Sequence, residues 1–203
     1  MQDWIDSHTY LHSLVGNPGF YGQLLMDDHA AFDRWNWPSG WTINDVINEI
    51  SWIVSYFKTQ YPGIRAGIRA REAQFSGTNY PVGLDFLMSQ YRYWGLGTLS
   101  PTQFVSQELG LAGGRGHALI FSINFENGGL GPSSPYGGSP YSHRVMYEVG
   151  PGELNTLWEA ATVDSPIMHG LAGWKFSSTF ISHPGILDVI SARRNALALL
   201  GPP

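Results

Sequence analysis

The stretch HALIFSINFE, residues 117–126, has the clearest strand pattern in the chain. Successive side chains of a β-strand point to opposite faces of its sheet. One face of this stretch carries Leu119, Phe121, Ile123 and Phe125, and the other carries Ser122, Asn124 and Glu126. The stretch therefore predicts a strand with one apolar and one polar face, whose polar row ends in a carboxylate.

Further strands and helices alternate around this one. Apolar periodicity and turn residues predict strands at 20–26, 64–70, 84–90 and 167–174, and helices at 4–15, 43–57, 100–114, 153–161 and 185–200. Two helix starts have capping signals. Thr42 with Asp45 forms a capping box, and Ser100 is a cap that is followed by Pro101 at the first helical position. The link from residue 70 to 84 is too short for a convincing helix. Residues 127–143 are rich in Gly, Pro and Ser and predict a long loop, either a lid or simply a mobile segment.

Alternating strands and helices predict an α/β fold with a parallel sheet and right-handed crossovers. A sheet covered on both faces is apolar on both, but here Gln23 and Asp27, Arg65 and Arg69, and Asp85 and Ser89 form polar rows. A partial or incomplete (β/α) TIM-barrel-like domain accounts for this pattern: about five parallel strands, helices outside and polar groups inside. An antiparallel sheet with one wet face is the alternative, which the intervening helices disfavour. We expect a single domain over residues 1–203, in which Arg65 or Arg69 pairs with Asp85.

Composition limits the classes of partner. The formal net charge of −5 argues against nucleic acid and anionic membranes, and no apolar run is long enough to span a bilayer. The absence of cysteine excludes disulfides and thiol chemistry, and the scattered histidines give no metal-site spacing, so we expect neither metal nor cofactor. Aromatic residues make up 14% and charged residues only 13%. That balance suits stacking on uncharged, hydroxyl-rich ligands, and equally a large aromatic core.

The order of elements resembles the carboxyl-terminal part of a TIM-barrel glycoside hydrolase. The resemblance rests on FYGQLLMDD (20–28), YPGIRAGIR (61–69), INFENGG (123–129) and GLAGW (170–174). It covers most of the chain in outline and implies that the five strands correspond to barrel strands four to eight. Asp27 and Asp28 would then end strand four and Glu126 strand seven, the places where such families carry the acid/base and the nucleophile.

Glycosidic cleavage fits these residue types. One carboxyl group donates a proton to the leaving oxygen, while a second attacks the sugar or activates water. The resemblance thus implies Asp27, Asp28 and Glu126 as catalytic residues. The alternative for Asp27 and Asp28 is that they cap a turn.

Other polar and aromatic residues near the predicted strand ends are candidates for substrate binding. They are Gln23, Trp35, Trp37, Arg69, Asn124, Asn127, Glu148 and Trp174. For the tryptophans, a buried loop cluster is the alternative to sugar stacking.

Five strands are fewer than a complete barrel needs. The chain is then a fragment, a truncated barrel that closes its open strand edges by forming homo-oligomers, or another α/β fold. The alternative function is that of a non-catalytic carbohydrate-binding or scaffold protein.

Overall fold

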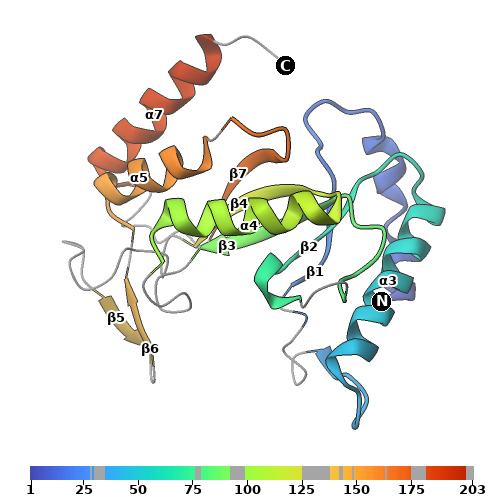
Figure 1. Ribbon diagram of the computed structural model, residues 1–203. Coiled ribbons are helices and arrows are strands. Elements are labelled where there is room, and N and C mark those ends of the chain that lie inside the picture. The colour runs from blue at the N-terminus through green and yellow to red at the C-terminus, as the bar shows by residue number, and fades with distance from the viewer. Residues whose placement is uncertain are drawn as a thin grey trace. The chain divides into compact units, whose positions relative to one another are not determined.

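The computed structural model describes residues 1–27, 29, 35–75, 79–91, 99–124, 138–141, 144–147, 149–162, 164–174 and 182–199 (Figure 1). For residues 124, 138–141, 144–147, 174, 194 and 196–199 it describes the backbone alone.

A five-stranded parallel sheet alternates with helices along the chain. Its strands follow the order β1 (Gln23–Asp27), β2 (Ala66–Arg69), β3 (Phe86–Tyr91), β4 (Ala118–Asn124) and β7 (Met168–Trp174). Neighbours in the sheet are thus neighbours in sequence, as in a barrel, whereas a doubly wound sheet reverses its strand order. Within the described residues the sheet is not closed. The predicted α/β fold, a partial barrel of about five parallel strands, is confirmed.

Helices occupy most of the connections between these strands. These are α3 (Ile43–Gln60), α4 (Pro101–Arg115) and α5 (Pro151–Ala161), and the 3₁₀ helix η2 (Glu72–Gln74) lies in the remaining connection. The helix α1 (Gln2–Ser7) and the 3₁₀ helix η1 (Thr9–Leu14) precede β1, and α7 (Pro184–Leu199) follows β7. In the connection from β2 to β3 the described residues contain only the single turn η2, as expected from its length. No described helix is long and apolar enough to cross a membrane.

Two predicted helix starts have the expected caps. The hydroxyl of Thr42 accepts from the amide of Asp45, whose carboxylate accepts from the amide of Thr42 at 2.7 Å. The same reciprocal pair joins Ser100 and Gln103 at the start of α4. These bonds satisfy amides that have no partner within the helix.

Two predictions about elements were wrong. The helix expected over residues 4–15 is two pieces, α1 and η1, because His8 leaves the helical region at φ −94° and ψ 44°. The loop expected through residue 143 contains the strand β5 (Gly138–Tyr141), which pairs antiparallel with β6 (Arg144–Tyr147). Glycine and proline in 127–143 favoured a loop, whereas pairing with the following strand organises its last part.

Two compact units make up the chain. The first contains Met1–Ser89 and Glu108–Ile120, and the second contains Gln90–Gln107 and Phe121–Pro203. In the second unit α5 packs against α7 and β7. The rings of Tyr91, Phe104 and Phe121 also meet there, with centroids 5.5 Å apart for the first pair and 5.9 Å for the second.

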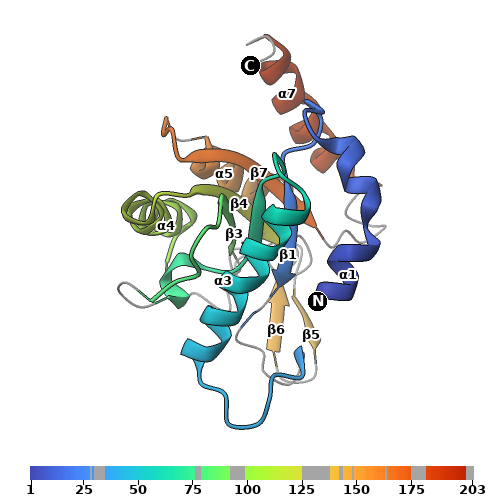
Figure 2. The same ribbon diagram turned by 90° about the vertical axis from the view of Figure 1, so that its right-hand side faces the viewer.

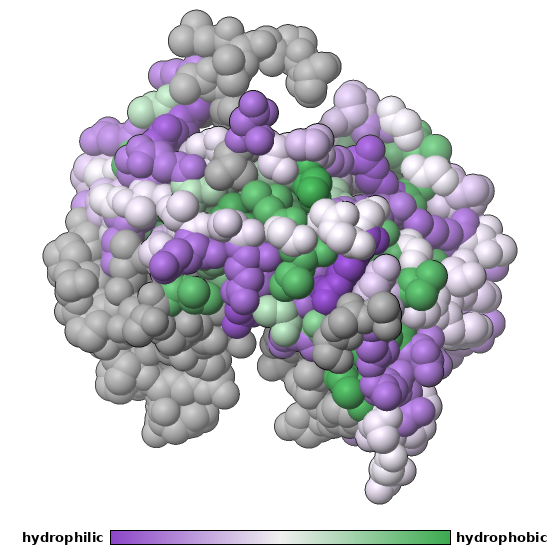
Figure 3. Space-filling view, in the orientation of Figure 1, coloured by the Kyte–Doolittle hydropathy of each residue, from purple (hydrophilic) through white to green (hydrophobic). Residues whose placement is uncertain are grey.

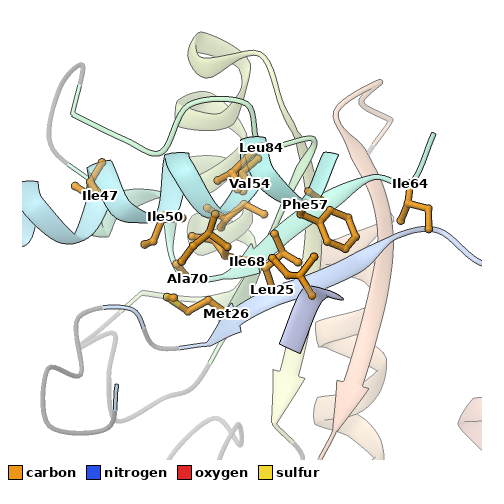
Figure 4. Packing of buried hydrophobic residues seen from close by; sticks show 14 of the residues in the cluster. Leu25, Met26, Ile47, Ile50, Val54, Phe57, Ile64, Ile68, Ala70 and Leu84 are labelled. Carbon is orange, nitrogen blue, oxygen red and sulfur yellow. The ribbon is translucent and has the colours of Figure 1, made fainter. Parts of the chain in front are cut away.

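The core of the first unit lies between α3 and one face of β1 and β2. Helix α3 runs beside β1 in the opposite direction (Figure 2). Its apolar face points at the strands, as the close view in Figure 4 shows for Val54 and Phe57 of α3 and Ile68 of β2. The apolar row predicted for β2, Ala66 with Ile68, is part of this core.

A β-bulge in β1 corrects the predicted strand faces. The register pairs Gln23 with Ala66 and Asp27 with Arg69, but it shifts between Leu24 and Met26. Because the extra residue breaks the alternation, Leu25 rather than Leu24 joins Met26 in the core. The prediction that Gln23 and Asp27 share a face was therefore wrong.

The predicted faces of β3 also need correction. Leu87 belongs to the core beside α3, and Ser89, two residues on, hydrogen-bonds to Glu108 of α4, so this row faces the helices. Phe86 points the other way and covers Gly67, where an added methyl group would overlap its ring. The sheet face away from α3 thus carries an aromatic ring at Phe86, and Ser89 is not part of it.

Candidate functional site

The carboxyl ends of β1 and β2 bring together four of the predicted site residues. The register places Asp27, Arg69 and Met88 in one row across β1, β2 and β3. Trp35 and Trp37 follow β1 and return to its end, as described below. Active sites of parallel α/β proteins form at this end of the strands, so we take this row and the two tryptophans as the candidate site.

Asp27 and Arg69 form a two-point ion pair. The Arg69 Nε donates to Oδ1 of Asp27, and its Nη2 donates to Oδ2. The Arg69 side chain is 9% exposed, whereas that of Asp27 is 42% exposed. A bidentate guanidinium fixes both the position and the plane of a carboxylate. Asp27 therefore presents a fixed, negatively charged group to solvent.

The tryptophans hold the chain that follows β1. The indole N–H of Trp35 donates to the backbone oxygen of Asp27 at 2.7 Å, and that of Trp37 donates to the oxygen of His29 at 3.1 Å. Trp37 also stacks on Trp41, with ring centroids 5.6 Å apart and planes 17° apart. All three rings are partly buried against the core. The alternative of a buried aromatic cluster thus holds in part, and of the three rings Trp35 contacts Asp27.

His29 lies in the same segment. Its ring is 1% exposed and stacks on Phe75 at a centroid distance of 4.8 Å. Among the residues that the structure describes, no three His, Cys, Asp or Glu side chains are grouped closely enough to hold a metal ion.

The remaining predicted site residues are less informative. Gln23 is four residues from Asp27, about 13 Å along the strand, and its amide donates to the oxygen of Leu24 at 2.8 Å. Asn124 and Trp174 are the last residues of β4 and β7, with no described side chain. Four more predicted residues lie outside the described ones: Asp28, Glu126, Asn127 and Glu148.

Asp85 has partners other than those expected. Its carboxylate accepts from Lys58 Nζ at 2.7 Å and from the amide of Ala66 at 2.8 Å. Arg65 instead lies over the ring of Tyr21, at 4.7 Å from its centroid, and Arg69 pairs with Asp27. The predicted pairing of Asp85 with Arg65 or Arg69 was therefore wrong: Asp85 pairs with Lys58, and the two side chains are 32% and 36% exposed.

Glu72, a residue that the sequence pattern did not single out, is the centre of a buried charge cluster. Its carboxylate binds Arg115 at 2.5 Å through one oxygen and His117 through the other. Arg115 also donates to the backbone oxygens of Glu72 and Phe75, at 2.7 and 2.9 Å, and lies over the ring of Tyr80. Arg115 thus closes the turn η2 against the end of α4.

A second buried acid, Glu108, completes this cluster. One oxygen accepts from the amide of Glu72 and from the hydroxyl of Ser89, both at 2.5 Å, and the other lies 3.7 Å from Nε of Arg71. Burial raises the pKa of Glu108, and the hydrogen bonds and Arg71 oppose that shift. The spacing of Phe104, Glu108 and Ala112 by four residues was a usable signal, since it places the acid on the apolar stripe of α4.

Burial separates this cluster from the site at Asp27. Glu72 and Glu108 are fully buried, and Arg115 and His117 are nearly so. A ligand has no access to these carboxylates. The cluster fastens η2 to α4. The turn η2 lies in the connection from β2 to β3, which has no longer helix among the described residues, whereas the other connections of the sheet have one.

In comparisons with known proteins, no family model and no curated protein matches the chain.

Proposed function

We propose that this protein binds a carbohydrate, or a ligand with the same neighbouring hydroxyl groups, at the carboxyl ends of β1 and β2. The observation that carries the proposal is the ion pair of Asp27 with Arg69. It holds a partly exposed carboxylate on the residue whose backbone oxygen accepts from the indole N–H of Trp35. Sugar sites combine such fixed polar groups with aromatic surface.

The carboxylate of Asp27 retains acceptor capacity in this pair. Two carboxylate oxygens offer about four lone-pair sites, and Arg69 uses two of them. The remaining lone-pair sites of Asp27 can accept hydrogen bonds from two adjacent sugar hydroxyls. The negative charge of the carboxylate strengthens these hydrogen bonds. The indole N–H groups of Trp35 and Trp37 are already bound to backbone, so their role toward a ligand is contact through the rings.

Calorimetric titration of the full chain with cello-, xylo-, malto- and chito-oligosaccharides tests this proposal. Asp27→Asn keeps the shape but removes the charge, and we expect it to weaken binding at least about tenfold. Asp188→Asn, at an exposed acid of α7, is the matched control and should bind as the wild type does. Equal affinities for wild type and Asp27→Asn, with both proteins folded by circular dichroism, would exclude this site.

Glycosidic cleavage is the second function we propose for this end of the sheet, as in the glycoside hydrolases that the sequence resembles. It is favoured by the exposed position of Asp27 at a strand end. Since both oxygens of Asp27 accept from Arg69, Asp27 suits the role of the carboxylate. The proton donor would then be Glu126, with Asp28 as the alternative carboxylate. Release of aryl alcohol from aryl glycosides should stop in Glu126→Gln and in Asp27→Asn, and undiminished turnover in both would exclude the mechanism.

We also propose that the chain associates with itself through open strand edges. Among the strands that the structure describes, β1 and β7 are the outer ones of the sheet, with one paired neighbour each. Unpaired backbone groups at such edges favour strand addition. Light scattering should give a particle of at least two chains, and a strictly monomeric particle would contradict this.

A further inference from the structure

The outward face of α3 has an unusual composition. Counting along the helix from Asn48, residues at 4, 7, 8 and 11 positions on form one stripe: Trp52, Ser55, Tyr56 and Thr59. This stripe lies opposite the apolar face that packs on β1 and β2. It contains one amide, three hydroxyls and two aromatic rings, but no charge.

Trp52 and Tyr56 form the aromatic part of the stripe. Their ring centroids are 5.5 Å apart and the planes differ by only 17°. The side chain of Trp52 is 46% exposed, although burial of such a ring would be favourable. The pair therefore presents two nearly parallel rings on the surface of a long, capped helix.

Polar groups of α1 fix the position of Tyr56. Its hydroxyl donates to Asp6 at 2.6 Å and accepts from the amide of Gln2 at 3.3 Å. α1 packs against α3, so these groups border the rings. A carboxylate, an amide and a hydroxyl thus lie beside the aromatic surface, within reach of a ligand stacked on it.

This chemistry selects among possible ligands. An uncharged stripe beside Asp6 does not attract nucleic acid or an anionic membrane, both of which need cations. A protein interface would favour a continuous apolar patch. From the side that Figure 3 shows, the area where Figure 1 places α3 has no large strongly hydrophobic patch. Rings flanked by amide, hydroxyl and carboxylate groups fit a neutral sugar, whose ring faces are apolar and whose edges carry hydroxyls.

We propose that the face of α3 with Trp52 and Tyr56 is a second carbohydrate-binding surface, which takes a neutral oligosaccharide or polysaccharide chain. It does not depend on the site at Asp27. The rings stack on sugar faces, and Asn48, Ser55 and the pair of Asp6 with Tyr56 donate to or accept from hydroxyls. The helix fixes the spacing of these groups, so the surface is formed before the ligand binds.

The test uses the full chain with cellulose, chitin, xylan and starch in pull-down assays, and with the corresponding hexasaccharides in calorimetric titration. We expect binding to at least one of these four probes. Trp52→Ala should weaken it roughly tenfold, and Trp52→Phe should retain most of it. Leu187→Ala on α7 is the matched control, because Leu187 is apolar and 47% exposed, and it should bind as the wild type does.

The Trp52 variants are compared in the Asp27→Asn background, in which the first site is weakened, so that the remaining sugar binding reports on the face of α3. If all four probes fail to bind, or if Trp52→Ala binds as tightly as the wild type, the proposal is wrong. If Trp52→Ala instead lowers the mass found by light scattering without changing sugar binding, the ligand of this face is a second copy of the chain.

Discussion

The carboxylate of Glu108 accepts a 2.5 Å hydrogen bond from the backbone amide of Glu72, so two acidic residues meet in the interior of the first unit. The arrangement is stable because their carboxylates have different partners. Glu72 is bound by Arg115 and His117, whereas Glu108 is bound by amides, a hydroxyl and, at longer range, Arg71. A buried charge is costly unless it is paired, and the two acids should therefore respond differently to substitution.

Glu108→Gln should change how stability depends on pH. Burial raises the pKa of Glu108 above its ordinary 4.5, so the folded state binds this proton more tightly than the unfolded state does. The tighter binding of this proton stabilises the folded state. That contribution is complete below pH 4.5 and is lost as the pH rises through the folded-state pKa of Glu108. The unfolding free energy of the wild type relative to Glu108→Gln should fall over that range. Urea unfolding at several pH values measures this difference, and a constant or rising difference would contradict the expectation.

Glu72→Gln should destabilise the protein by about 3–5 kcal/mol, because it leaves the buried guanidinium of Arg115 without its charged partner. The control is Glu159→Gln. Glu159 pairs with Arg193 at 2.9 Å but is 60% exposed, so its loss should cost at most about 1 kcal/mol. Urea unfolding at neutral pH compares the two variants. Similar costs for both would show that the buried cluster does not stabilise the first unit.

The double variant Glu72→Gln/Arg115→Gln extends this comparison. If the ion pair is the cause, the double variant should be less destabilised than the sum of the two single changes. Simple additivity would instead point to lost packing.

The strand order and the capped helices were accessible from the sequence, whereas the pairing of Glu72 with Arg115 was not. Thr42 with Asp45 and the apolar stripe of α3 are local patterns, and local patterns determine local structure. Glu72 and Arg115 are far apart in the sequence and each resembles an ordinary surface residue. Only the fold brings them together.

The bulge in β1 was inaccessible for another reason. Leu24, Leu25 and Met26 are all apolar, so the pattern fits either face and contains no sign of an extra residue. For the candidate site, Asp27 and Arg69 were both expected near strand ends, but their direct pairing depends on the register that the bulge sets.

Gly67→Ala should destabilise the first unit by about 1–3 kcal/mol, because the added methyl group would overlap the ring of Phe86. Phe86→Leu in the same chain should recover part of that loss by vacating the space. Gly110→Ala in α4 is the control, since nothing lies within 4 Å of the added group, and there alanine should stabilise by about 0.5–1 kcal/mol. Thermal unfolding measures all three. A neutral Gly67→Ala would mean that Phe86 does not cover this face.

Hydrogen exchange of the indole N–H groups should separate the two aromatic surfaces. Trp35 and Trp37 donate to backbone oxygens and are partly buried, so their indole protons should exchange slowly. Trp52 has no such bond among the described residues and is 46% exposed, so its indole proton should exchange fast. Nuclear magnetic resonance resolves one indole signal for each tryptophan, and Trp35→Phe and Trp52→Phe assign them. Fast exchange at Trp35 would show that its indole N–H does not bind the backbone oxygen of Asp27. The tryptophans there would then be available to stack on a sugar with their N–H groups free to donate, and the ligand contacts proposed for that site would change accordingly.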